Sequence, residues 1–593
     1  MSEFSTPSYS GKQWWKEAVV YQVYPRSFAD ANGDGIGDLK GITAKLPYLQ
    51  KLGINVIWLS PVFDSPNVDN GYDISDYFAI MGDFGTMEDF DELLETAHSY
   101  GIKILMDLVA NHTSDQHPWF VQSKSSRENP YRDYYIWKDP KGFEEDGTPI
   151  PPNNWASEFG GSAWEWDENT QQFYLHIFFK EQPDLNWENP RVREDLYSMV
   201  RWWLDKGVDG FRLDAINIIS KPEGFPDDPD TDFEKHTSSI PFVIANGTMV
   251  HPWMKELNAQ SFGRYDVMTV GETSQTSPED AKLWAGYDAG ELQMIFHFDH
   301  MGVDTDPNGN LGGKWSYAPF KLSELKRILN AWQTELEGNA WGSLYWNNHD
   351  QPRVVSRFGN DSPQWRVKSA KQLATTLHFM QGTPYIYQGE ELGMTNVRFE
   401  SIEDYRDGDS LRFYEDMHVE RGNLSREEAL RAIYIKGRDN ARTPMHWDAS
   451  AHAGFSFGQD VQPWISVNPN YAEINAEAAL ADEDSIFYHY QQLASLRRDE
   501  LKDLMVYGSF KPLDIEDEQV YAYERVGGPE GTDASQSLLV VSNFTDQELE
   551  RRYDVLEQAR AAGASVELVH SNYADDQGDT LRPYEAKVYR ISR

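Results

Sequence analysis

Short runs of hydrophobic and aromatic residues recur along the chain, and each ends abruptly in polar residues. Eight of these runs are rich in β-branched and aromatic side chains and predict buried strands, at 19–25, 54–60, 102–109, 207–214, 266–272, 294–298, 344–350 and 383–391. Amphipathic stretches such as 87–101 and 193–207 lie between the runs and predict helices. Strands that alternate with helices predict a parallel sheet, and eight such units predict an α/β fold of the (β/α)₈ TIM-barrel type.

Two long connections interrupt this alternation. Residues 112–187 follow the third strand, are rich in Trp, Pro, Gly and Asn, and predict a small inserted domain. A second insertion, about 392–480, follows the eighth strand, so the predicted barrel comprises 1–111 and 188–506. From 507 to 593 short alternating strands predict an antiparallel all-β C-terminal domain.

Composition and charge narrow the choice of partners. The 593 residues include 53 basic and 96 acidic side chains, which gives a net charge of −43. Such a field repels nucleic acid and anionic membranes, so we expect neither as a partner. The chain has no cysteine, no apolar segment of membrane-spanning length and no signal-like start, and we therefore expect a cytoplasmic protein.

Charged residues follow several predicted strands, at the end where TIM barrels carry their functional groups. Asp214, Glu272 and Asp350 end the fourth, fifth and seventh strands, and the barrel brings them to one mouth. Paired carboxylates suit cleavage of a glycosidic bond, because one can attack the anomeric carbon while the other protonates the leaving oxygen. The third can bind sugar hydroxyls in the transition state.

Several motifs resemble those of a known family. The segments "DLVANH", "GFRLDAIN", "VGET" and "NNHD" look like the four consensus regions of the α-amylase family (glycoside hydrolase family 13). "QPDLNW" resembles the region that marks the oligo-1,6-glucosidase and α-glucosidase (maltase–isomaltase) branch, as do "NGYDISDY", "SIEDYRD" and "RDNARTPMHWD". The motifs occur in family order over nearly the whole chain.

The resemblance implies roles for the acids. Asp214 would be the nucleophile, Glu272 the general acid/base and Asp350 the transition-state stabiliser. Arg212 precedes Asp214 by two residues, so it lies on the same side of the strand and can keep that carboxylate ionised.

Further residues are implied to bind the substrate: Tyr72, Asp73, His112, Phe178, Ala215, His349 and Arg442. The two histidines would donate to hydroxyls of the glucose that is released, and Tyr72 and Phe178 would face its ring. Asp73 and Arg442 resemble the pair that grips the far hydroxyls of a terminal glucose and closes the pocket. Relatives with Val after the nucleophile tend to prefer α-1,6 linkages and those with Thr α-1,4 linkages; Ala215 matches neither.

The expected activity is that of a retaining, exo-acting α-glucosidase on maltose- or isomaltose-type oligosaccharides, with transglucosylation at high substrate concentration. A sucrose isomerase or dedicated glucosyltransferase of the same family is the alternative. Sucrose isomerases carry a charged "RLDRD" stretch after the seventh strand, whereas this chain has the hydrolase-like "SRFGND" at 356–361. A non-catalytic transporter subunit is a remote alternative, because such relatives need a membrane anchor.

The segment "DANGDGIGDLKGI" at 30–42 has the ligand spacing of a calcium loop, with oxygen donors at Asp30, Asn32, Asp34, Ile36 (backbone) and Asp38. An EF-hand needs a Glu at its twelfth position, where this chain has Gly41, and the preceding residues predict a strand instead of a helix. A Gly/Asp-rich turn without metal remains an alternative. The resemblance implies a structural cation in this loop, Ca²⁺ or Mg²⁺.

Overall fold

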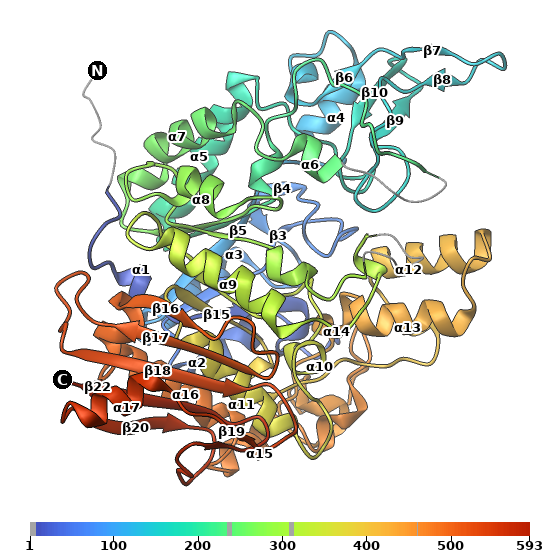
Figure 1. Ribbon diagram of the computed structural model, residues 1–593. Coiled ribbons are helices and arrows are strands. Elements are labelled where there is room, and N and C mark those ends of the chain that lie inside the picture. Colours follow the sequence, from blue (N-terminus) through green and yellow to red (C-terminus); the bar gives the residue numbers. More distant parts are fainter. Residues whose placement is uncertain (1–7, 234–239, 307–312, 459) are drawn as a thin grey trace.

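The computed structural model describes residues 8–233, 240–306, 313–458 and 460–593 (Figure 1). Its central sheet has eight parallel strands, in the order β13-β12-β11-β5-β2-β1-β15-β14. The strands are β1 (Val20–Val23), β2 (Val56–Leu59), β5 (Lys103–Val109), β11 (Gly210–Asp214), β12 (Met268–Glu272), β13 (Met294–Phe296), β14 (Ser343–Leu344) and β15 (Thr383–Tyr387). The two edge strands meet where the Ser343 hydroxyl donates to the carbonyl oxygen of Ile295 at 2.8 Å, so the barrel is nearly closed.

Seven of the eight strands lie inside their predicted runs. The exception is β14, which ends at Leu344, so that residues 345–350 of the predicted strand form an irregular segment. The aromatic side chains of this segment are buried without being part of a strand. Their presence explains why its composition resembles that of a strand. The segment carries His349 and Asp350 into the barrel mouth.

Helices cover the outside of the barrel, chiefly α2 (Leu39–Leu52), α3 (Met87–Ser99), α5 (Pro190–Lys206), α7 (Val250–Gln260), α8 (Pro278–Ala285), α9 (Leu322–Leu336), α11 (Arg366–His378) and α16 (Ile486–Arg498). Local sequence sets their ends. The side chains of Thr86 and Asp89 form a reciprocal capping box at the start of α3. Gly207 ends α5 with a φ of 111°, a left-handed conformation that favours glycine.

The predicted insertion after the third strand is a small antiparallel unit (Figure 1, top). Its sheet has the order β6-β10-β9, formed by β6 (Trp137–Lys138), β9 (Trp164–Asp167) and β10 (Gln172–Leu175). A hairpin of β7 (Gly142–Phe143) and β8 (Pro149–Ile150) and helix α4 (Pro118–Ser125) complete it. The buried ammonium of Lys221 ties this unit to the barrel, 2.7 Å from Asp184 and 2.9 Å from Asn111.

The segment after β15 is helical, although its sequence shows little periodicity. It contains α12 (Gly408–Tyr414), α13 (Arg426–Lys436), the single turn α14 (Asp439–Arg442) and α15 (Ala476–Ala481). A π-helical turn, Glu415–Glu420, continues α12. Helices α12 and α13 extend from the barrel on the same side as the small inserted unit (Figure 1, orange).

The C-terminal region forms an antiparallel sheet of five strands in the order β16-β17-β18-β22-β20 (Figure 1, red). These are β16 (Ser509–Leu513), β17 (Val520–Val526), β18 (Gln536–Asn543), β20 (Ser565–Ser571) and β22 (Ala586–Ser592). Helix α17 (Asp554–Ala561) was not expected from the sequence. It packs Leu556 and Ala559 into a hydrophobic cluster with residues of the C-terminal sheet. Within the described ranges, no helix has both the length and the apolar composition to cross a membrane.

Candidate active site

Arg212 lies at the centre of the barrel mouth and contacts three carboxylates. Its Nη1 is 2.9 Å from Asp107 and 2.5 Å from Asp214, and its Nη2 is 2.8 Å from Glu272. Strands β5, β11 and β12 are neighbours in the sheet, which brings acids that are far apart in sequence to one guanidinium. Arg212 contacts Asp214, as its position two residues before that acid predicts, and it also contacts Glu272, which the sequence did not indicate.

The surroundings raise the pKa values of Glu272 and Asp214 toward neutral pH. Burial raises the pKa of Glu272 to about 7; Arg212 opposes this shift, and the charges of Asp214 and Asp350 add to it. Burial likewise raises the pKa of Asp214 to about 7 against the pull of Arg212. Two interacting acids titrate as a pair, so near neutral pH the pair can hold one proton and one negative charge. That state combines a proton donor and a nucleophile.

Asp350 lies in a different electrostatic environment from the other two acids. Its carboxylate is 2.8 Å from Arg442, 3.3 Å from Arg438 and 3.1 Å from His349. Burial acts to raise the pKa of Asp350, but His349 and the two arginines outweigh it and hold the pKa well below its ordinary value. Asp350 therefore stays ionised at every pH at which the protein is expected to be active.

The predicted partnership of Asp73 with Arg442 is wrong. Both carboxylate oxygens of Asp73 accept backbone N–H groups, from Val68 and Asp69 at 2.9 Å each, so Asp73 shapes the loop. Arg442 instead binds Asp350 and lies 3.6 Å from Asp407.

Asp69, in the same loop as Asp73, also faces Arg438. Its Oδ1 is 3.5 Å from Nη2 of Arg438 and, within the part of the chain that the structure describes, accepts no hydrogen bond although it is buried. Burial raises the pKa of Asp69 to about 6, and Arg438 and Arg442 oppose the shift. Such an unsatisfied buried oxygen beside two cations is a ready acceptor for a ligand hydroxyl.

Two features of the sequence are consistent with this cluster of Asp69, Asp407, Arg438 and Arg442. Arg438 and Arg442 are four residues apart, the spacing that places two side chains on one face of a helical turn. Asp407 lies in the "SIEDYRD" motif, and its Oδ1 is 2.7 Å from Arg438.

The predicted aromatic and histidine residues lie together beside the acids. Gln22 donates to Nδ1 of His349 at 2.8 Å, which leaves Nε2 of His349 to donate to the Tyr72 hydroxyl at 2.7 Å. The Tyr72 ring stacks on the His349 ring with centroids 5.2 Å apart. His112 Nε2 is 3.0 Å from the Tyr72 carbonyl oxygen, and the half-buried Phe178 ring lies 5.0 Å from the His112 ring.

Ala215, directly after Asp214, has a left-handed backbone with φ of 42° and ψ of 36°. Its N–H donates to Oε2 of Glu272 at 2.9 Å. The turn therefore connects the predicted nucleophile to the predicted acid/base through the main chain.

The predicted metal loop is closed by its own hydrogen bonds. Asp30 accepts the N–H of Gly33 at 2.6 Å and that of Gly35 at 2.9 Å, and Asp38 caps helix α2 by accepting the N–H of Gly41 at 2.6 Å. Gly41 is required because a Cβ there would lie 2.0 Å from the carbonyl oxygen of Ala29. Among the described residues no three acidic or histidine side chains form a metal cluster, so a cation would also need amide and carbonyl oxygens. Asn32 and Ile36 offer these, and the hard oxygen donors fit Ca²⁺ or Mg²⁺.

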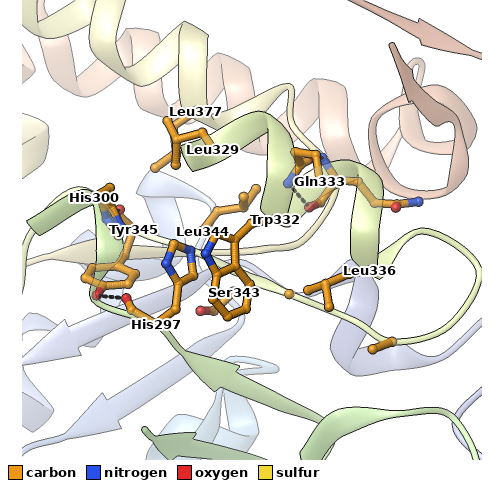
Figure 2. Close-up of a pocket in the computed structure, with 13 residues that line it drawn as sticks. His297, His300, Leu329, Trp332, Gln333, Leu336, Ser343, Leu344, Tyr345 and Leu377 are labelled. Atoms are coloured by element: carbon orange, nitrogen blue, oxygen red, sulfur yellow. Dashed lines mark hydrogen bonds between the residues drawn. The ribbon is translucent and has the colours of Figure 1, made fainter. Parts of the chain in front are cut away.

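A separate small cavity lies where β13 and β14 meet. Its volume is about 20 Å³, and Figure 2 shows the parallel rings of His297 and Trp332 along it, with centroids 3.9 Å apart. The Tyr345 hydroxyl donates to the carbonyl oxygen of His297. Nδ1 of His297 and of His300 have no partner among the described residues. The space fits one water molecule and no sugar.

A parallel barrel with an acid pair on a shared cation at its mouth defines an enzyme of glycoside chemistry. Residues 22–508 match the catalytic domain of α-amylase, and the chain belongs to the α-amylase family, in its oligo-1,6-glucosidase and α-glucosidase branch.

Relatives that match the chain over nearly its full length are named for different activities. The chain is 53% identical to an oligo-1,6-glucosidase of Bacillus cereus, over 98% of this chain and 100% of the relative. It is also similar to the crystal structure of a trehalose-6-phosphate hydrolase of Bacillus licheniformis, with a TM-score of 0.89, 46% identity, and 98% and 100% of the two chains covered. An isomaltulose synthase of Klebsiella sp. LX3 gives a TM-score of 0.89 at 42% identity, with the same coverage.

Proposed function

We propose that this protein is a retaining, exo-acting α-glucosidase that releases glucose from the non-reducing ends of short α-glucosides of the maltose and isomaltose type. The observation that carries the proposal is the contact of Asp214 and Glu272 with adjacent nitrogens of Arg212. Two carboxylates that contact one guanidinium are near each other, which supports direct attack by one of them; a carboxyl spacing of about 5–5.5 Å is typical of that mechanism. An inverting enzyme needs a wider gap that admits water.

The reaction runs in two displacements. The Asp214 carboxylate attacks the anomeric carbon while Glu272 gives its proton to the leaving oxygen, and a glucosyl ester forms on Asp214. The ester carries no charge, so one of the charges that raise the pKa of Glu272 disappears. Glu272 then acts as the base that takes a proton from water, and water releases glucose with its configuration retained.

The charged residues around Asp350 would determine which glycosidic bond of the oligosaccharide is cut. Asp69, Arg438 and Arg442 surround Asp350 with fixed charges and donors. We propose that they bind the far hydroxyls of the terminal glucose, with His112 and His349 beside them. A pocket closed by charged side chains admits one glucose unit, so the enzyme removes units from chain ends.

Initial rates on maltose, isomaltose, nigerose and sucrose, with products followed over time and the first anomer identified by ¹H NMR, test this function. We expect glucose released first as the α-anomer from maltose or isomaltose. Release of the β-anomer would overturn the retaining mechanism.

The same experiment separates the alternatives. A sucrose isomerase would give mainly rearranged disaccharide from sucrose, and a dedicated glucosyltransferase would give longer oligosaccharides with little free glucose. We propose transglucosylation only as a side reaction at high substrate concentration, because water and a sugar hydroxyl compete for the same glucosyl-enzyme. A non-catalytic transporter subunit would release nothing.

We also propose that the 30–42 loop binds Ca²⁺ or Mg²⁺ as a structural ion. Asp30, Asn32, Asp34 and Asp38 with the Ile36 carbonyl would hold it, and it would stiffen the connection between β1 and α2. A cation that binds only the folded state stabilises it by mass action.

The proposal also includes a cytoplasmic location and small oligosaccharides as substrates, with neither nucleic acid nor membranes as partners. The absence of cysteine from 593 residues means that an oxidising compartment would add nothing to stability. The net charge of −43 disfavours nucleic acid and anionic membranes.

A further inference from the structure

Asp350 and the two arginines that bind it lie on short segments outside the strands of the barrel. Asp350 follows β14 in the irregular segment, whereas Arg442 ends the single turn α14 and Arg438 is the N-cap residue of that turn. In the sequence, 88 and 92 residues separate Asp350 from Arg438 and Arg442. No ladder of strand hydrogen bonds joins the two segments, so their relative position depends on side chains.

The Arg353 side chain joins these two segments. It lies three residues after Asp350 and is 1% exposed. Its Nε donates to the carbonyl oxygen of Asn440 at 3.0 Å, and its Nη2 donates to that of Ala441 at 3.2 Å. Its Nη1 donates to the carbonyl oxygen of Gln388, directly after β15, at 2.5 Å. One guanidinium therefore connects the segment of Asp350 to α14 and to the barrel.

The two carbonyl groups on α14 belong to the residues directly before Arg442. In the last turn of a helix the carbonyl groups lack partners within the helix, and a cationic side chain is a favourable donor to them. Helix α14 has only four residues, so bonds from outside the turn largely determine where it lies. A shift of these carbonyls would move Arg438 and Arg442 relative to Asp350, because all four groups belong to the same turn.

Tyr387, the last residue of β15, supports the same turn. Its hydroxyl donates to the carbonyl oxygen of Ala441 at 2.7 Å, and its ring lies 5.2 Å from the guanidinium of Arg353. Ala441 and Tyr387 are fully buried and pack together with Tyr24. Two side chains from different parts of the barrel thus meet at one carbonyl of α14.

Arg353 has no carboxylate partner among the residues that the structure describes, although it is buried. Burial lowers its pKa, and Tyr387 and Glu391 oppose the shift. Burying a cation is costly unless its donors are used. The rigid fork of a guanidinium can direct three nitrogens to carbonyls of two segments, which neither lysine nor an apolar side chain can do. The geometry of the fork therefore accounts for an arginine at this position.

We propose that Arg353 is a positioning residue for glucose binding, because it fixes α14 so that Arg438 and Arg442 meet Asp350 and the terminal glucose. The inference rests on the proposed function and deepens it, since it names the residue that keeps the glucose pocket in its binding shape. Arg353 itself donates to protein carbonyls and acts on the substrate only through the two arginines.

Arg353→Lys tests this role, because lysine keeps the charge and loses the fork. We expect kcat/KM for maltose and for p-nitrophenyl α-glucoside to fall together by about 10- to 100-fold, since both substrates carry the same glucosyl group. The inhibition constant of glucose should rise about tenfold, the scale of one hydrogen bond to a charged group. A purely structural role would lower the melting temperature and the fraction of active protein, and would leave KM and the inhibition constant unchanged.

Arg525→Lys is the matched control. Arg525, on β17, is also fully buried and donates to the backbone carbonyls of Phe379 at 2.7 Å and Met505 at 2.8 Å. Phe379 precedes the start of β15, at the end of the barrel opposite the mouth. Arg525→Lys should lower the melting temperature without changing the inhibition constant of glucose. An equal rise of that constant in both variants would overturn the specific role of Arg353.

Tyr387→Phe removes the second donor to Ala441 and decides the case if Arg353→Lys does not fold. The inhibition constant of glucose should rise about two- to fivefold in this variant, the scale of one neutral hydrogen bond. An unchanged constant in folded Arg353→Lys, or in Tyr387→Phe where the first variant does not fold, would overturn the inference. So would a loss confined to one of the two substrates. These results would leave the proposed function intact, whereas a wild type that released glucose from neither substrate would contradict the proposed function itself.

Discussion

The backbone N–H of Ala215 donates to Oε2 of Glu272 at 2.9 Å, from a left-handed conformation with a φ of 42°. The residue after the proposed nucleophile therefore helps to position the proposed acid/base. Its side chain is also the one whose size accompanies linkage preference in relatives. Ala215 thus combines a left-handed backbone with a main-chain contact to the proposed acid/base.

Ala215→Val should raise the ratio of kcat/KM for isomaltose to that for maltose, and Ala215→Thr should lower it. Both β-branched residues are disfavoured at positive φ, so we expect each to lower the free energy of unfolding by about 1 kcal/mol. Steady-state kinetics on the two disaccharides and thermal denaturation measure the two effects. Equal ratios in all three proteins would show that this position does not control linkage.

Asp69 and Asp73 should respond differently to replacement by Asn. Asp69→Asn removes the charge that faces Arg438, so kcat/KM for maltose should fall about 10- to 100-fold with an unchanged melting temperature. Asp73→Asn disturbs an acceptor of two backbone N–H groups and should destabilise the fold by about 1–3 kcal/mol. The opposite pattern, with catalysis lost in the Asp73 variant and stability lost in the Asp69 variant, would restore Asp73 as the substrate ligand.

The rate on maltose should fall as pH rises through about 7. Glu272 acts as an acid in the first step, its folded pKa is raised to about 7, and the proton it needs is lost above that pH. The profile of kcat/KM against pH reports this ionisation for the free enzyme. Because Asp214 and Glu272 titrate as a pair, the measured value belongs to both.

Glu272→Gln is the control for that assignment. It should remove the fall at high pH and should harm maltose far more than p-nitrophenyl α-glucoside, whose leaving group needs little protonation. A fall near pH 7 that persists in this variant would assign the ionisation to another group.

Calcium should raise the melting temperature of the protein, and EDTA should lower it. Calcium at 100 times its dissociation constant would add about 2.7 kcal/mol to the free energy of unfolding. Asp34→Ala removes an exposed donor of the 30–42 loop and should abolish the response without changing kcat. A melting temperature that is insensitive to EDTA, calcium and magnesium would identify the loop as a metal-free turn.

The strand ends explain how much of the site the sequence could predict. Asp214 and Glu272 stand at the last positions of β11 and β12, so the barrel rule alone places them at one mouth. Asp350 lies near the other two acids although β14 ends at Leu344, so the barrel rule alone does not explain its position.

The predictions that the structure contradicts concern loops. There the spacing of residues along the sequence does not determine the direction in which a side chain points. Asp69 and Asp73 lie in one loop, four residues apart, and only the backbone path determines which faces Arg438 and which binds N–H groups. Neither residue has a periodic pattern around it that could have revealed its role.

The most direct test of the mechanism is the rate of p-nitrophenol release from p-nitrophenyl α-glucoside by Asp214→Ala, with circular dichroism to show that the variant is folded. The account predicts that kcat falls by at least about 10⁴-fold, the scale on which loss of a nucleophile acts. A folded Asp214→Ala protein that kept a substantial fraction of the wild-type rate would contradict the assignment of Asp214 as the nucleophile.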